Sequence, residues 1–405
     1  MAVPNQGDRH DDDPTLSAGL AALLRRADAI GRVGSCFADE LSQQRKREGG
    51  DIVPLSGAPR RPPPAHVIEA AQRAMTETGY AQGRGILALR QALATKVAGE
   101  TGIRVDAEQQ IVVTNGAMQA LHIIMTGLLA PDEEVIIPSP CYSYDGLVRL
   151  AGANPVIVPM RIEDDYAWDM ERIRSAITAK TRLLVVNTPT NPTGRVLTMV
   201  ELTELVRIAQ EYDLLLLADE AYDRLVYDGR RHVSIYSIEG AAERTIVVQS
   251  ATKSYAMGAW RIGWIVAPRT LATVFARMIE WMMLAVNHIA QAAATAVISG
   301  PQDWLADLAT EFQSNRDLSV GLLGTIEGIS FVVPQGGPFL IPDVSRLGVS
   351  GDDFAETLIK AYGLRVSGGS HYHSPKSIRV PYGGTPAAIE ETFRRMRHAV
   401  TALRA

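Results

Sequence analysis

Seven short apolar runs lie between residues 111 and 266, and longer segments of helical or turn character separate them. Most of the runs are rich in β-branched side chains, which favour strands. A strand that is apolar on both faces has to be covered on both faces, and helical connections let such strands pair in parallel. The pattern predicts an α/β domain with a mostly parallel seven-stranded sheet. The predicted strands are 111–113, 135–137, 156–158, 183–186, 214–217, 246–248 and 262–266.

The rest of the chain predicts a second, smaller domain, because 405 residues are too many for one ordinary hydrophobic core. Beyond residue 300, amphipathic helices are predicted over 302–323 and 386–403, on either side of a Gly/Pro-rich segment at 334–338. We expect a smaller α+β domain there, completed by part of the N-terminal arm. The expected division is 1–62 for the arm and part of the small domain, 63–295 for the large domain and 296–405 for the small domain.

The N-terminal arm is expected to begin without order. Residues 1–15 are polar and acidic, whereas residues 16–48 have a helical rhythm that ends near Gly49 and Gly50. The proline-rich run at 59–64 cannot continue a helix or a central strand, so it predicts a linker or an edge segment. The opening residues lack the order of a signal peptide, and no run reaches 18 apolar residues. We therefore expect no membrane span and no export.

Composition narrows the class of protein further. Hydrophobic residues make up 46% of the chain and charged residues 21%, which is typical of a soluble folded enzyme. The formal net charge of -5 argues against binding nucleic acid through a broad basic surface. The two cysteines, Cys36 and Cys141, support neither a disulfide framework nor a zinc site, so we expect a cytoplasmic protein without a metal.

Candidate functional residues directly follow five of the predicted strands, because open α/β sheets bind ligands at the carboxyl ends of their strands. After the first strand, Gly116 and Ala117 open a helix, whose N–H groups suit an anion, although a plain turn explains them equally well. After the second, Tyr142 and Tyr144 could stack on a planar ring or simply pack against the next element. Residues 187–194 contain no large apolar side chain, which favours a functional loop.

The last two places carry charges. Asp219 and Glu220 follow an apolar strand, where their burial is costly unless one of them meets a cation or a metal; a surface turn is the alternative. Lys253 follows another apolar strand with hydroxyl neighbours, and Arg261 lies eight positions further on. A partly desolvated lysine is a nucleophile toward carbonyls, and hydroxyls with a guanidinium suit a phosphate.

Taken together and in this order, these segments resemble the class I/II aminotransferases, which are fold type I enzymes dependent on pyridoxal 5′-phosphate (PLP). The resemblance covers residues 50–385, and its most specific parts are 187–194, 218–222 and 250–253 with Arg261. It implies the fold of aspartate aminotransferase, with a large PLP-binding domain, and the transfer of an amino group between an L-amino acid and a 2-oxo acid.

The resemblance also implies roles for individual residues. Lys253 would form the Schiff base with PLP and move the substrate proton, and Asp219 would pair with the pyridine nitrogen. Tyr222, the third residue implied in catalysis, would bond the phenolic oxygen of PLP together with Asn191. The other residues implied in cofactor binding are Tyr142 on the ring face and Gly116, Ala117, Ser250 and Arg261 around the phosphate.

Three further positions concern the substrate and the partner subunit. Arg379 matches the arginine that binds the substrate α-carboxylate, a bidentate task that suits a guanidinium. Gly57 matches the segment that folds over the substrate. Tyr80 matches a tyrosine that reaches the cofactor phosphate of the neighbouring subunit, which implies a homodimer with shared active sites.

The chain departs from the family pattern in two places. Arg60 and Arg61 stand where an acidic or aromatic residue is usual, and they are either a basic lid for an acidic substrate or solvated arginines beside a linker. The segment 366–373 stands where the family usually has Pro at 368 and an aromatic-Gly pair at 372–373. Its two histidines, His371 and His373, could serve a second acid–base step or simply form hydrogen bonds on a loop.

Two alternatives to amino transfer stay open. A cyclase, a lyase or an amino-acid oxidase can use the same PLP scaffold, because the reaction outcome depends on side chains whose positions a sequence does not fix. Aminotransferase-like domains also bind effectors in transcription regulators, but such proteins need a DNA-binding domain that the short N-terminal arm does not offer. The amino donor and acceptor are not indicated by the motifs.

Overall fold

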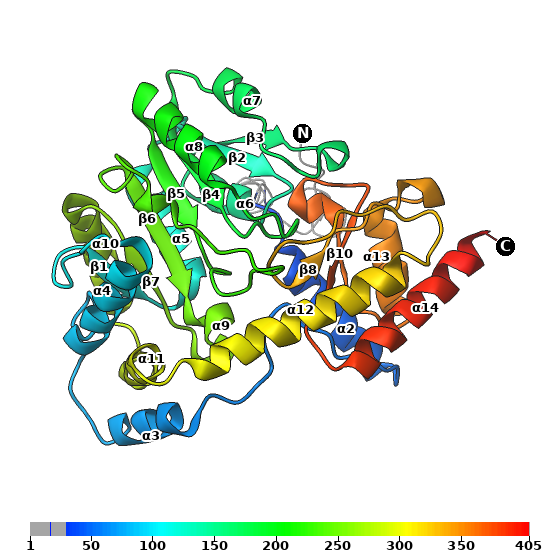
Figure 1. The fold of residues 1–405 in the computed structure, drawn as a ribbon, viewed down its shortest axis with the longest axis horizontal. Helices are drawn as coiled ribbons and strands as arrows, with labels where there is room; N and C mark the ends of the chain where they lie inside the picture. The colour runs from blue at the N-terminus through cyan, green and yellow to red at the C-terminus, as the bar shows by residue number, and fades with distance from the viewer. Residues whose placement is uncertain (1–16, 18–29, 405) are drawn as a thin grey trace.

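The computed structural model describes Ser17 and residues 30–404. A large sheet with helices on both faces occupies one side of the molecule, and a small sheet with its own helices occupies the other (Figure 1). Helix α12 runs from the side of the large sheet toward α14 at the C-terminal end (Figure 1). This arrangement confirms the predicted α/β class with a smaller α+β part.

The large sheet contains all seven predicted strands. Its order is β1-β7-β6-β5-β4-β2-β3, and only β7 is antiparallel to its neighbours. Because β7 runs opposite to both β1 and β6, the other six strands point the same way, and their carboxyl ends lie at one edge. The bounds are β1 Ile111–Thr114, β2 Glu134–Ser139, β3 Asn154–Pro159, β4 Thr181–Asn187, β5 Leu215–Asp219, β6 Thr245–Ser250 and β7 Gly263–Val266.

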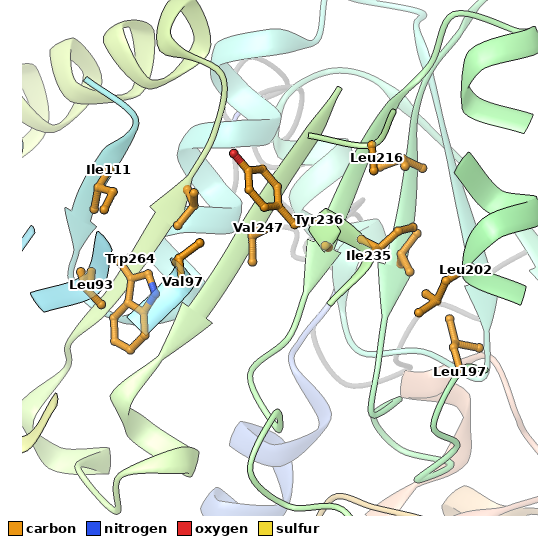
Figure 2. Packing of buried hydrophobic residues seen from close by; sticks show 14 of the residues in the cluster. Leu93, Val97, Ile111, Leu197, Leu202, Leu216, Ile235, Tyr236, Val247 and Trp264 are labelled. Atoms are coloured by element: carbon orange, nitrogen blue, oxygen red, sulfur yellow. The ribbon is translucent and has the colours of Figure 1, made fainter. Parts of the chain in front are cut away.

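Side chains alternate between two hydrophobic cores, one on each face of the large sheet. On strand β5, for example, Leu216 belongs to the first core and Leu217 to the second. Figure 2 shows the first core, with Leu93 and Trp264 packed together and Leu202 further along the same face. Both faces are therefore sealed from water, as a parallel sheet requires.

Different helices cover the two faces. The first core is covered by α4 (Leu87–Thr101), α8 (Met199–Glu211) and α11 (His288–Ser299), with α3 (Ala65–Ala74) packed on α11. The second core is covered by α5 (Gly116–Leu128), α6 (Tyr144–Leu150) and α10 (Arg269–Met283). The short elements of this part are α7 (Met170–Ser175), α9 (Ala251–Ser254) and the 3-10 turns Ile162–Asp164, Ile235–Ser237 and Gly258–Trp260.

A third core belongs to the smaller part of the molecule. Its antiparallel sheet has the order β8-β10-β9, and the predicted helices at 302–323 and 386–403 are present as α12 and α14. Val53 and Leu55 of the N-terminal arm are buried in the same core. The elements are α2 (Gly34–Arg47), α12 (Asp303–Leu323), β8 (Phe339–Leu340), α13 (Gly351–Lys360), β9 (Ser367–Gly368), β10 (Ile378–Pro381), α14 (Pro386–Arg404) and the turns Ser345–Leu347 and Gly369–Tyr372.

The N-terminal arm follows its prediction in part: the end of the predicted helix is correct, but residues 30–33, predicted to be helical, precede helix α2 and are not helical. Helix α2 ends just before Gly49 and Gly50, while the predicted disorder at 1–15 and the earlier part of the predicted helix lie outside the described residues. The proline-rich run at 59–64 has no helix or strand. We propose domain boundaries near residues 62 and 296, because the third core contains residues that precede the large sheet in the sequence and residues that follow it. Among the described helices, none is long and apolar enough to cross a bilayer.

Helix α8 offers a test of how local signals stabilise this fold. It begins with a capping box, in which Thr198 Oγ1 accepts from the Glu201 amide and Glu201 Oε2 accepts from the Thr198 amide. We expect Thr198→Ala to lower the apparent free energy of unfolding by about 1 kcal/mol in urea denaturation. Thr203→Ala in the same helix should change it by less than about 0.5 kcal/mol, because that hydroxyl is exposed and caps nothing. Equal losses in the two variants would contradict the assignment of the cap.

Candidate active site

Five buried polar side chains end five strands of the large sheet at the same edge. Each lies two positions after a residue of the second core, so alternation places all five on the face covered by α5, α6 and α10. Such a row of buried polar groups needs partners or a ligand. The five residues are Thr114, Ser139, Asn187, Asp219 and Ser250.

Lys253 lies just beyond this row, in the short helix α9. Its Nζ donates a hydrogen bond to the carbonyl of Gly57 at 2.7 Å and lies 5.8 Å from the centre of the Tyr222 ring. Burial, followed by the positive charges of Arg379, Arg261 and others, lowers the pKa of Lys253 to about 7. An amine that is neutral near pH 7 is a competent nucleophile and base.

Asp219 is the carboxylate at the centre of the row. Its Oδ2 accepts a hydrogen bond from the Tyr144 hydroxyl at 2.7 Å, and its Oδ1 accepts one from the Ala221 amide at 3.2 Å. Burial raises the pKa of Asp219, and the charge of Glu220 adds to this, while the two hydrogen bonds act in the opposite direction. A cation placed opposite this carboxylate would therefore be strongly favoured.

A chain of polar contacts runs from the large sheet to the small one. Arg379 Nη1 donates to Asn191 Oδ1 at 3.2 Å, and Asn191 Nδ2 donates to the Tyr222 hydroxyl at 3.4 Å. The backbone N–H of Asn191 in turn donates a hydrogen bond to Asn187 Oδ1 at 2.7 Å. The predicted residues Asn191, Tyr222 and Arg379 are thus in direct contact.

Arg379 is held between two aromatic rings. Its guanidinium carbon lies 4.1 Å from the centre of the Phe339 ring and 4.5 Å from that of Tyr372. The side chain is buried, and among the described residues its Nε has no hydrogen-bond partner. A buried guanidinium with a free donor is suited to a carboxylate ligand.

An anion cradle lies at the start of helix α5. Gly116 has a φ of 77°, and a Cβ at this position would lie 2.4 Å from Arg261 Nη2, so only glycine lets the guanidinium approach the backbone. Arg261 Nη1 is fixed by Thr252 Oγ1 at 3.2 Å and by the Gly258 carbonyl at 3.1 Å. Near it, Ser250 Oγ caps α9 by accepting from the Thr252 amide at 3.0 Å. The amides that begin α5 and this guanidinium can hold an anion together.

The remaining predicted positions divide into two groups. Ala117 is the second residue of α5 beside the cradle, and Tyr142 lies at the rim with its ring 6.0 Å from that of Tyr144, so both lie near the others. Gly57 contacts Lys253 through its carbonyl. Tyr80 is 93% exposed and contributes nothing to this site within one chain.

Several residues of the site were not assigned roles from the sequence. Tyr144 was noted only as a stacking candidate, yet it bonds Asp219. Asn187 supports Asp219 and Asn191 from the strand end. Phe339 and Tyr372, which enclose Arg379, carried only one signal: each lies near a Gly-rich turn.

The two departures from the family pattern have structural partners. Arg61 forms an ion pair with Glu311 of α12 at 3.1 Å, and Arg60 is exposed, which favours the linker interpretation over a substrate lid. His373 Nε2 lies 3.4 Å from Asp145 Oδ2. Burial lowers the pKa of His371, whose ring packs near Phe37. Within the described part of the chain, no group of three His, Cys, Asp or Glu residues is placed to hold a metal ion.

Comparison with known proteins gives a consistent result. Residues 53–396 match the family described as aminotransferase class I and II. An aromatic-amino-acid aminotransferase of Thermococcus litoralis is 34% identical over 84% of this chain and 89% of its own length. An aspartate aminotransferase of Bacillus subtilis is 31% identical over 93% and 98%. The structure of Thermus thermophilus aspartate aminotransferase with maleate superposes with a TM-score of 0.87 at 33% identity, covering 93% of this chain and 98% of that one.

The lowered pKa of Lys253 can be measured in the protein without added ligand. An ordinary exposed lysine titrates near about 10.4, whereas Lys253 should become reactive as the pH rises through about 7. We expect pulse acetylation followed by mass spectrometry to show this midpoint. Arg379→Ala should move the midpoint upward, because it removes a positive neighbour, while Arg394→Ala on α14 should leave it in place. A midpoint above about pH 9 would contradict the described environment.

Proposed function

The chain belongs to the class I and II aminotransferases, enzymes that move an amino group between an amino acid and a 2-oxo acid, and we propose that it does so with PLP bound around Lys253. The observation that carries this proposal is that Lys253, the anion cradle of Gly116 and Arg261, and the buried carboxylate Asp219 all lie at one edge of the large sheet. The named relatives are aminotransferases, which favours amino transfer over the cyclase, lyase and oxidase alternatives.

The residues present fit PLP in charge and in hydrogen-bonding character. Lys253 would hold the aldehyde carbon covalently, and the amides of Gly116 and Ala117 with Arg261 would bind the phosphate. Asp219 would face the ring nitrogen, which removes the cost of burying its carboxylate alone. The other proposed contacts are those of Asn191 and Tyr222 with the phenolic oxygen, of Tyr142 with the ring face and of Ser250 with the phosphate.

The division of labour in the reaction follows from these positions. When bound, PLP supplies an electron sink for the bond that breaks at the substrate Cα. Lys253 Nζ, with a pKa of about 7, can accept the Cα proton and return it to another carbon at neutral pH. Asp219 would keep the ring nitrogen protonated, and the Tyr222 hydroxyl stays neutral because burial raises its pKa. Lys253 thus transfers the proton, while Asp219 and Tyr222 keep fixed protonation states.

Arg379 would bind the α-carboxylate of the substrate. Its Nη1 is already oriented by Asn191, and its stacking on Phe339 and Tyr372 fixes the plane of the guanidinium. The free Nε gives it an unused donor. A carboxylate held there stays close to Lys253, since the two side chains influence each other electrostatically.

We also propose a homodimer with shared active sites. An exposed apolar patch, made of Met75, Tyr80, Trp281, Met282 and Leu284, lies on two neighbouring segments: a Cβ at Gly83 would touch Glu280 of α10. Trp281 is 92% exposed, an unusual state for the largest apolar side chain. The patch adjoins the cradle, because Met283 contacts Gln119 near the start of α5. A second copy seated there could bring its Tyr80 to the phosphate.

The activity is tested with a panel of amino donors, including aspartate, phenylalanine and arginine, with 2-oxoglutarate as acceptor. We expect glutamate to form with at least one donor, and Lys253→Ala to reduce the rate by at least about 10³-fold, because both the covalent link and the proton carrier are lost. Lys360→Ala on the surface of α13 should retain the wild-type rate. Glutamate formation unchanged in Lys253→Ala would overturn the proposed role.

Shared sites are tested by mixing two inactive variants. Tyr80→Ala and Lys253→Ala would each have little activity as homodimers. A mixed dimer contains one intact site, built from Lys253 of one protomer and Tyr80 of the other. We expect co-refolded variants to recover up to about a quarter of the wild-type activity, since about half of the dimers are mixed and each has one intact site. Trp281→Asp should give a monomer in sedimentation analysis. Absence of any recovery while the dimers form would show that the sites are not shared.

A further inference from the structure

Two consecutive buried carboxylates, Asp219 in the active site and Glu220 behind it, follow one another at the end of β5 and point in opposite directions. Asp219 is on the face of the second core, and Glu220, which is fully buried, lines a cavity of about 290 Å³ beside residues of the first core. Val97, Tyr236 and Val247, which Figure 2 shows against this face, line the same cavity. Nothing in the proposed chemistry uses Glu220, so its burial needs a separate explanation.

The contacts of Glu220 identify its partner. Oε1 accepts a hydrogen bond from Ser234 Oγ at 2.7 Å. Oε2 lies 3.2 Å from His232 Nε2, an ion-pair contact without hydrogen-bond geometry, and among the described residues neither Oε2 nor either ring nitrogen of His232 has a hydrogen-bond partner. The His232 side chain is 11% exposed, so solvent gives the pair little screening.

Asp223, which lines the same cavity, belongs to a second buried ion pair. Lys96 Nζ lies 3.1 Å from Asp223 Oδ2, and both side chains are buried. Gln249 accepts from Lys96 at 3.1 Å and from Trp264 Nε1 at 3.0 Å, which fixes this pair against the sheet. Asp223 also accepts from Ser254, the residue after Lys253. Lys96 also lies 2.6 Å from Glu100 Oε2, and Glu100 is paired in turn with Arg224. Among the described residues, His232 is the one basic side chain within ion-pair distance of Glu220.

We propose that His232, as an imidazolium, is a positioning residue that balances the charge of Glu220 and thereby keeps Asp219 ionised on the opposite face of the sheet. With His232 neutral, the four buried groups carry one net negative charge directly behind Asp219. That charge is closer to Asp219 than to a ring bound beyond it. It therefore disfavours the Asp219 carboxylate and moves the shared proton from the ring nitrogen toward Asp219.

The surroundings of His232 determine the pH range of this effect. Burial alone lowers its pKa, but Glu220 and then Asp223 outweigh burial and the charge of Lys96, so the pKa of His232 is raised. The imidazolium is therefore present at low pH and is lost as the pH rises through this raised value. The other charged groups that line the cavity are Glu100, Arg224, Arg230 and Arg231.

The charge state of His232 can be tested without any ligand. The ring signal of His232 can be assigned by NMR, because it is absent from the spectrum of His232→Gln. Glu220→Gln should shift this signal more than that of any other histidine. We expect its midpoint to lie above the usual value of about 6.5 and to fall in Glu220→Gln. A midpoint that lies below about 6 and does not respond to Glu220→Gln would overturn the proposal.

The effect on Asp219 rests on the proposed binding of PLP and is measured as the dissociation constant of PLP at several pH values. We expect His232→Gln to weaken binding roughly tenfold at low pH, equivalent to about one pKa unit at the ring nitrogen. The difference in dissociation constant between His232→Gln and the wild type should disappear at pH values above the midpoint found by NMR. His398→Gln, an exposed histidine of α14, is the matched control and should bind as the wild type does.

The double variant Glu220→Gln/His232→Gln separates charge from structure. It removes both members of the pair, so binding should return to within about threefold of wild type if charge balance is the role. A double variant as weak as His232→Gln would show a merely structural role, and a His232→Gln that binds normally would show that Glu220 takes up a proton instead; either result contradicts the proposal. If the wild type itself fails to bind PLP, the proposed function fails, while the NMR result still decides the charge of His232.

Discussion

Burial of the large sheet on both faces is the constraint on which the rest of the structure depends. Because helices seal both faces, each polar side chain at a strand end must find a partner inside the protein. Asp219 finds Tyr144 on one face, and Glu220 finds Ser234 and His232 on the other. The same alternation that builds the hydrophobic cores therefore separates the site from the charge cluster behind it.

The site lies where the large sheet meets the smaller part of the molecule. Gly57 and Arg379 come from that part, Lys253 and Asn191 from the large sheet, and hydrogen bonds join the two groups. The loop 187–194 also packs closely there, since a Cβ at Gly194 would lie 2.5 Å from Pro334 Cβ. The spacing between the Lys253 amine and the Arg379 guanidinium therefore depends on how the two parts pack together.

Electrostatics give the site its chemical character. Burial, together with the cationic side chains around Lys253, lowers the pKa of its amine to about 7, while burial raises the pKa of Asp219 at the end of β5. Arg379 lies between aromatic rings, whose faces attract a cation. Opposite charges are thus kept apart by packed, rigid elements and are available to a ligand that carries both signs.

The sequence by itself determined the seven strands, the two long helices of the smaller part and the order of the polar segments, because hydrophobic periodicity and turn residues act over short distances. The resemblance of its motifs gave the family, which the comparisons confirm. Only the tertiary structure decided that Tyr144 bonds Asp219, that Phe339 and Tyr372 enclose Arg379, and that His232 faces Glu220. Such contacts join residues that are distant in the chain or point to different faces, and close packing alone sets the directions of their side chains.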